Sequence, residues 1–338
     1  MSADKKTGLT HIGELLPGFE QLKAMQLKAI KPPPEPKALT IQGKHHFTRI
    51  KQIDALAGIA DDPNADMGFM ARLLTLCSLP RTNPGTRLQY KRQNGPYKLI
   101  MIAGGDNKLP YGNLPRLLLA WVCTEAVRTQ EQKLILGNSL TAFMRDLGMY
   151  SDSGGSRGDR TRLKHQIDRL FNCHVDLIYE DKTTKVSTGG RFAPQTVLWW
   201  DYHRPEQDTL WQSWILLGEE LFKEIIAHPV PLDMRILKAM RRSPLGLDLY
   251  MWLSYKTFTL YSQKKKPEFL SWNRLYRQFG SNPELADDHR TVQNFRQDVL
   301  RELQKLKTCW PALNFTTPKG CLEIRGCPPS VSPKAIGR

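Results

Sequence analysis

The sequence predicts an α+β fold, because segments with helical spacing of apolar residues alternate with short runs that have the pattern of strands. Two further observations refine this prediction. One order of elements, namely helix, strand, helix, helix and hairpin, occurs twice along the 338 residues, and each copy contains a helix with a basic polar face. This order is typical of a winged helix. We therefore predict two tandem winged-helix domains, related by pattern only, because the copies share no obvious residue identity.

The composition of the chain divides it into four expected regions. Residues 1–45 are expected to be a flexible N-terminal leader, in which the segment KPPPEPK at 31–37 forms a semi-rigid polyproline tether. Residues 46–205 are expected to form the first winged-helix domain, with extra strands at its start. Residues 206–326 would form the second, and residues 327–338 a C-terminal tail.

The first copy is expected to begin with two strands that are joined by a turn at 93–96. Pro115 suits the first turn of the strongly apolar helix that follows. The expected elements are strands at 87–91, 97–103 and 133–136, helices at 114–128, 139–148 and 156–170, and a hairpin of 173–179 with 196–202 whose tip is Gly189 and Gly190.

The second copy is expected to end in a long amphipathic helix and a short hairpin. Asp287 and Asp288 suit the N-terminus of that helix, and Gly280 ends the helix before it. The expected elements are strands at 214–217 and 269–271, helices at 218–227, 244–257, 272–279 and 287–307, and a hairpin of 313–315 with 322–324.

The helix at 156–170 carries the first candidate site. Leu163, Ile167 and Leu170 recur at helical spacing and would anchor one face to the core. The other face would present basic side chains to solvent: Arg157, Arg160, Arg162, Lys164, His165 and Arg169. A shorter helix and a turn with Gly154 and Gly155 precede it, as in a helix–turn–helix. A solvated charged helix with no partner is the alternative interpretation.

The helix at 287–307 carries the second candidate site, because side chains suited to base edges cluster near its start. Arginine pairs with guanine, and asparagine and glutamine pair with adenine. The candidates are His289, Arg290, Gln293, Asn294, Arg296 and Gln297, with Arg301 further along to contact phosphate. An ordinary polar surface helix is again the alternative.

The net charge favours a polyanionic partner. Lys and Arg total 49 against 33 acidic residues, which gives a formal net charge of +16. We find no apolar run of membrane-spanning length and no secretory signal, so double-stranded DNA is a better partner than a membrane surface, and a cytoplasmic location is expected. The six cysteines form no CxxC pair and no zinc-like set, so we expect neither a metal nor a cofactor.

The sequence contains no recognisable combination of catalytic residues, so the chain is predicted not to be an enzyme. The segment Gly154–Asp159 is rich in glycine but lacks the Gly-Lys-Ser/Thr of a phosphate-binding loop. Tyr250 and Tyr255 lie in an aromatic helix, where core packing is the expected role. Asp146 and Asp159 are separated by a turn and give no defensible metal site for a nuclease.

Four blocks of residues give the chain a family resemblance. They are GNSLTAFMRDLGM at 137–149, SGGSRGDRTRLKHQIDRLF at 153–171, WILLGEELF at 214–222 and AMRRSPLGLDLYMWL at 239–253. From about Met67 to Ile324 the chain resembles the RepA-type plasmid replication initiators of Gram-negative bacteria, close to the TrfA-like group. The resemblance implies binding to direct repeats (iterons) at an origin, opening of an AT-rich segment, and recruitment of the host replication initiator and replicative helicase.

The resemblance also implies copy control through exchange between a dimer and a monomer. Leu117, Leu118 and Trp121 are candidates for an association surface, because the layer before the first basic helix has more apolar residues than one small domain needs to cover it. Two other interpretations stay open. One is a winged-helix transcriptional repressor without origin-melting activity, and the other is a relaxase or tyrosine recombinase, which would need a nucleophile that we do not find.

Overall fold

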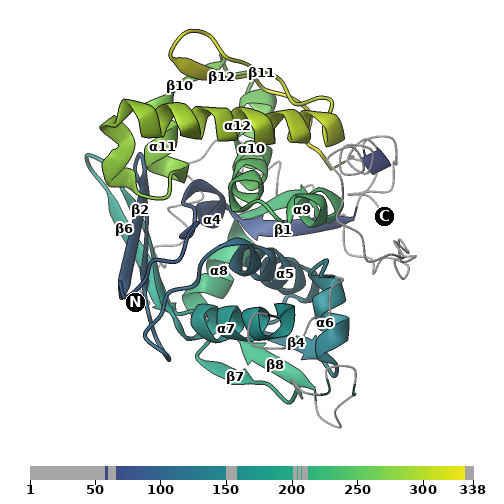
Figure 1. Ribbon diagram of the computed structural model, residues 1–338. Coiled ribbons are helices and arrows are strands. Elements are labelled where there is room, and N and C mark those ends of the chain that lie inside the picture. The colour runs from purple at the N-terminus through teal and green to yellow at the C-terminus, as the bar shows by residue number, and fades with distance from the viewer. Residues whose placement is uncertain are drawn as a thin grey trace, which may run out of the picture.

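The computed structural model of the protein describes residues 58–59, 66–149, 158–200, 204, 207 and 212–331 (Figure 1). Helices and antiparallel sheets alternate along the chain, so the predicted α+β class is confirmed. The predicted leader at 1–45 lies outside the described residues, as do Gly154, Gly155 and Arg157. The predicted tail is described only as far as Val331.

One connectivity occurs in both halves of the molecule. In each half a long helix is followed by a strand, two helices and finally two strands, and the first strand pairs with the last. In the first half β5 (His174–Glu180) and β6 (Lys185–Arg191) are inserted between the second of these helices and the final two strands. In the first half these are α5 (Asn113–Thr129), β4 (Lys133–Gly137), α6 (Leu140–Asp146), α7 (Asp159–Asn172), β7 (Gln195–Val197) and β8 (Ser213–Leu216), in the sheet order β4-β8-β7. In the second half they are α10 (Pro244–Ser262), β10 (Glu268–Ser271), α11 (Trp272–Phe279), α12 (His289–Cys309), β11 (Phe315–Thr316) and β12 (Cys321–Ile324), in the order β10-β12-β11.

Side-chain caps fix where these helices begin. Ser243 accepts a hydrogen bond from the backbone N–H of Gly246 at 3.0 Å, and Pro244 occupies the first turn of α10. Asp288 accepts one from the N–H of Thr291 at 2.8 Å at the start of α12. The predicted helices of the second half begin within two residues of the observed ones because these signals are local, whereas α10 ends at Ser262, five residues beyond its predicted end.

The hairpin predicted at 173–202 is wrong. β5 (His174–Glu180) pairs with β6 (Lys185–Arg191) and, on its other side, with β3 (Tyr97–Ile102). β3 also pairs with β2 (Gln89–Asn94), which completes a four-stranded sheet. Gly189 and Gly190 lie within β6 rather than at the turn. A Cβ at Gly189 would clash with the carboxylate of the facing Asp176, so glycine leaves room for that side chain.

The predicted boundary between residues 205 and 206 divides a sheet. β8, expected in the second domain, pairs with both β4 and β7 of the first half. Ile215 in β8 is fully buried and completes the core of that half. The apolar pattern of 214–217 predicted a strand correctly, but it could not specify which sheet the strand joins.

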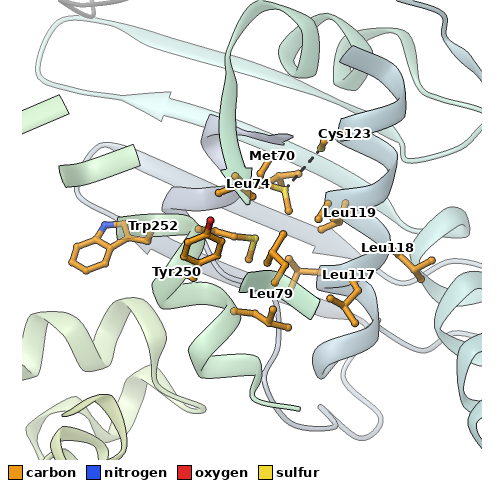
Figure 2. Packing of buried hydrophobic residues seen from close by; sticks show 14 of the residues in the cluster. Met70, Leu74, Leu79, Leu117, Leu118, Leu119, Cys123, Tyr250 and Trp252 are labelled. Atoms are coloured by element: carbon orange, nitrogen blue, oxygen red, sulfur yellow. Dashed lines mark hydrogen bonds between the residues drawn. The ribbon is translucent and has the colours of Figure 1, made fainter. Parts of the chain in front are cut away.

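A central layer joins the halves (Figure 1). It contains the antiparallel pair β1 (Met67–Ala71) and β9 (Pro229–Asp233), with α4 (Arg72–Leu76), α8 (Glu219–Ala227) and α9 (Met234–Met240) around it. Figure 2 shows Leu117–Leu119 of α5 and Tyr250 of α10 on either side of Met70 and Leu74. The buried apolar residues of both halves therefore form one continuous cluster.

The predicted association surface on α5 is wrong. Leu117, Leu118 and Trp121 are only 3%, 0% and 8% exposed. The helix is packed against β1, α7, α8 and α10, so it is covered from Leu114 to Thr124, and only its last turn is exposed. A predominantly apolar helix is typical of a core. The central layer buries the apolar surface of α5 that a single small domain would have left exposed.

The central layer also encloses a polar cluster. Glu224 of α8, His228 at the C-terminal cap of α8 and Arg72 of α4 are all buried, and Nη2 of Arg72 lies 3.9 Å from Oε1 of Glu224. Burial raises the pKa of Glu224 to about 7, and burial together with the charge of Arg72 lowers the pKa of His228 to about 3. The imidazole is therefore neutral, and its 3.9 Å contact with Glu224 is not an ion pair at neutral pH.

Candidate nucleic-acid interface

The helix α12 has one buried face and one exposed face. Its apolar side chains are directed into the core, namely Val292, Phe295, Val299, Leu303 and Leu306. The opposite face forms a stripe of polar side chains at helical spacing, which we call the α12 stripe: His289, Arg290, Gln293, Asn294, Gln297 and Arg301. All six are exposed, so most of the second predicted site lies together on one surface.

The donors of the α12 stripe are available to a partner. Within the described part of the chain, no hydrogen bond or ion pair engages the side chains of Arg290, Gln293 or Asn294. Hydrogen bonds from Thr291 lower the pKa of Asp288, so the capping carboxylate is ionised and suits the positive end of the helix dipole. Arg301 pairs with Asp298 at 3.1 Å, but both side chains are about half exposed, so this pair is weak.

Arg296 does not belong to the stripe. Its guanidinium lies 5.6 Å from the centre of the Trp272 ring of α11, and the side chain is half-buried. Tyr276 and Phe295 make a second ring contact between the two helices, with centroids 5.2 Å apart. Arg296 therefore lies on the side of α12 that packs on α11, and its base-contacting role stays a prediction.

The helix α7 is amphipathic as predicted, because Leu163, Ile167 and Leu170 are buried. Arg162, Lys164 and His165 are exposed. Arg162 pairs with Asp159 at 3.1 Å, an exposed contact within one turn of helix that a phosphate can replace. Arg160 is half-buried and engaged within the protein.

The predicted placement of Arg169 on the solvent face is wrong. The residue is 9% exposed, its Nε lies 3.4 Å from Oδ2 of Asp106, and its guanidinium is 5.5 Å from the centre of the Tyr111 ring. One turn earlier, Gln166 accepts a hydrogen bond from the N–H of Tyr111 at 2.9 Å. This side of α7 therefore holds the loop before α5 and is not available to a ligand.

Two exposed basic residues were missed by the sequence analysis. Lys319 lies in the turn between β11 and β12, where Gly320 has φ +82°. Arg274 is exposed in the first turn of α11. The sequence Pro318-Lys319-Gly320 predicted the turn correctly, and a basic residue at the tip of a hairpin beside a helix–turn–helix was a usable signal for a phosphate contact.

The described residues offer no assembled catalytic centre. Tyr250 is fully buried, accepts a hydrogen bond from the N–H of Asp233 at 2.7 Å, and has a pKa raised by burial, so it acts in packing as predicted. Among the residues with described positions, no group of three or more His, Cys, Asp or Glu side chains could hold a metal ion. No helix in the described ranges is long and apolar enough to cross a membrane.

The solved structures that are similar to this chain include two of RctB. A crystal structure of selenomethionine derivatives of domains 2 and 3 of RctB is 15% identical, with a TM-score of 0.47, and covers 76% of this chain and 96% of its own. A second structure of RctB domains 2–3 is 13% identical, with a TM-score of 0.44, and covers 74% of this chain and 94% of its own. Among curated proteins no relative matches.

A family model covers the centre of the molecule, from the loop before α5 to the first turn of α11. Residues 109–274 match the family described as "Plasmid encoded RepA protein". This range includes α7 and all four blocks of residues that carried the predicted resemblance. The predicted resemblance is thus confirmed over this segment, which is similar to the RepA family of plasmid-encoded proteins.

Proposed function

We propose that this protein is a sequence-specific, double-stranded DNA-binding replication initiator that binds direct repeats (iterons) at a plasmid origin. The observation that carries the proposal is the α12 stripe, an exposed row of donors on the second helix of a helix–turn–helix. The family of residues 109–274 and the net charge of +16 support the same function.

The geometry suggests a division of roles between the halves. Arg290 can donate two hydrogen bonds to guanine, and Gln293 and Asn294 can pair with adenine, because they lie near the N-terminus of α12. Arg162 and Lys164 of α7 are suited to phosphate. We infer that each repeated unit is a winged helix, with the turn at 317–320 as the wing of the second.

The later steps of initiation rest on the family relationship. In this proposal, the bound protein opens an adjacent AT-rich segment, recruits the host initiator and helicase, and controls copy number by exchange between monomer and dimer. None of these steps requires a covalent reaction by the protein, so no enzymatic activity is proposed. The buried positions of Leu117, Leu118 and Trp121 move any dimer contact away from that face of α5.

Footprinting on the DNA that flanks the gene in its own replicon tests the proposal. The expected result is protection of a set of direct repeats, with weaker protection for R290A. Uniform, sequence-independent protection would contradict specific binding. The same stripe would also suit a transcriptional repressor, which is the second candidate. Permanganate reactivity of supercoiled origin DNA separates the two, because only an initiator opens the AT-rich segment.

A further inference from the structure

Four consecutive carbonyls at the end of α11 are capped by side chains from the first half of the chain. The carbonyls of Arg277 and Gly280 each accept a hydrogen bond from Arg92 at 2.8 Å. The carbonyl of Gln278 accepts one from Ser78 at 3.0 Å, and that of Phe279 accepts one from Arg81 at 3.2 Å. These are the groups that a helix leaves without partners at its C-terminus, so α11 depends on β2 and the segment before it for its cap.

Burial and hydrogen bonds hold the Arg92 side chain in this position. Its side chain is 1% exposed, and its Nε donates to the Tyr90 hydroxyl at 2.6 Å. That hydroxyl in turn donates to the carbonyl of Ser78 at 3.0 Å, and burial raises the pKa of Tyr90, which therefore remains a neutral phenol. In the parts of the chain that are described, no carboxylate forms an ion pair with Arg92. The charge is therefore matched by the negative end of the α11 dipole and its carbonyls.

A second set of contacts holds the same segment from the other side. Arg116 of α5 lies 2.7 Å from both carboxylate oxygens of Asp248 of α10. Its remaining donors reach the carbonyls of Leu79, Pro80 and Gly112, so all five N–H groups are used. Residues 78–81 are thus fixed to the long helices of both halves while they cap α11.

Side-chain contacts fix α11 to α12. The contacts of Trp272 with Arg296 and of Tyr276 with Phe295 join the two helices, and Arg277 pairs with Asp287 at 2.9 Å just before α12 begins. The position of α12 therefore depends on its packing against α10 and, through α11, on capping residues that lie outside both helix–turn–helix segments.

We propose that this cap, made of Ser78, Arg81 and Arg92, sets the spacing between the two DNA segments that the protein contacts. The inference rests on the proposed function. With the cap intact, the α12 stripe and α7 engage DNA at one separation only, and the second contact adds to affinity at that separation. With the cap removed, each contact keeps its own side chains but the α12 stripe can reorient.

The test uses the full chain, a duplex with the footprinted site, and duplexes with one or two base pairs inserted between the contacted segments. Each inserted pair turns one segment relative to the other by about 35°. R92M removes the cap while keeping side-chain length. K91M is the matched control, because Lys91 is exposed on the same strand and loses the same charge. The S78A/R81Q double variant is a milder change to the same cap.

When two base pairs are inserted, the unchanged protein and K91M are expected to lose about 100-fold in DNA affinity. A loss of this size is expected when the second of two linked DNA contacts can no longer form. R92M and S78A/R81Q are expected to lose less than about 10-fold, while their affinity for the isolated α12 half of the site is unchanged. Amide exchange should be faster in the last turn of α11 in both cap variants. An equal loss in the cap variants and K91M overturns the inference.

The outcomes also separate this inference from the proposed function. If the unchanged protein binds specifically but tolerates every insertion, the proposed function stands and the spacing device is excluded. If the unchanged protein binds no duplex specifically, both fail. If R92M does not fold, the double variant decides, because it leaves the buried Arg92 in place.

Discussion

The third helix of each repeated unit presents its polar residues differently in the two halves. On α12 the stripe from His289 to Arg301 is exposed, and most of its donors are unoccupied among the described residues. On α7 the protein itself uses part of the basic set, because Arg169 is buried against Asp106 and Arg160 is half-buried. A similar density of basic residues in two sequences therefore gives different binding surfaces, and base recognition is better suited to the second half.

The contrast has a structural origin. In the first half, the loop at 104–112 packs on one side of α7, and the β5–β6 hairpin is inserted after it. The second half has no such insertion between α12 and β11, which are joined by a short connection. The loop at 104–112 and the β5–β6 hairpin link α7 to the rest of the protein, whereas α12 lies apart from both.

The largest expected effect is the loss of stability when the buried ion pair between Arg116 of α5 and Asp248 of α10, which joins the two halves, is broken. D248N leaves the buried guanidinium of Arg116 without its carboxylate. Loss of one partner of a buried ion pair costs about 3–5 kcal/mol, so the free energy of unfolding should fall by that amount in urea denaturation followed by circular dichroism. E125Q, which breaks an exposed pair with Arg128, serves as the control and should cost less than about 1 kcal/mol. Similar values for the two variants would show that the joint is not stabilising.

The next effect sharpens the contrast between α12 and α7. R290A should weaken binding to the cognate duplex by about 1–3 kcal/mol and relax one position of the site, because a base contact is lost. R169A should lower the stability of the protein and leave sequence preference unchanged, because Arg169 is buried against Asp106. Titrations against a set of single-base variants of the site measure both. If R290A lowers affinity equally for all sequences, base recognition by α12 is disproved.

The polar cluster of the central layer gives a prediction of intermediate size. The raised pKa of Glu224 means that the native state binds its proton more tightly, so this group stabilises at low pH and loses that contribution as pH rises from about 4.5 to 7. The lowered pKa of His228 acts oppositely, and its contribution is lost as pH falls from about 6.5 towards 3. Between pH 4.5 and 6.5 native and unfolded states hold one proton each on this pair, so the two effects offset.

Variants that remove Glu224 or His228 singly should reveal the opposite pH dependences that the two residues give to the free energy of unfolding. Relative to the unchanged protein, H228Q should gain stability as pH falls from 6.5 to 4.5, and E224Q should lose it, each by up to about 1.4 kcal/mol per pH unit. Urea unfolding at several pH values measures the difference. Parallel curves for all three proteins would mean that neither group has a shifted pKa.

The smallest expected effect is that of a single phosphate contact. Six contacts would give a slope of log affinity against log salt near −5, and K164A should reduce its magnitude by about 0.9 while weakening all sequences alike by less than about 1 kcal/mol. K182A, in the exposed turn between β5 and β6, is the control and should leave the slope unchanged. A slope shallower than about −2 for the unchanged protein would exclude phosphate contacts by both helices.

The sequence predicted features that depend on neighbouring residues. The helix at Trp272–Phe279 has the expected bounds, because a serine cap and a following glycine lie next to it, and the exposed face of α12 follows from its own periodicity. The partner of β5 was missed, because alternation identifies a strand but not its neighbour in the sheet. The burial of Arg169 was missed too, since Asp106 and Tyr111 lie about 60 residues earlier in the chain.

The pairing of β1 with β9 has a consequence for synthesis of the protein. Met67 faces Asp233 and Ala71 faces Pro229, so β1 emerges from the ribosome long before its partner exists. Until then its edge is open and its apolar side chains lack their final neighbours, a state in which nascent chains associate with chaperones or with each other. A chain truncated after the first helix–turn–helix would remain in that state. The pairing of β1 can therefore be completed only when translation has passed Asp233.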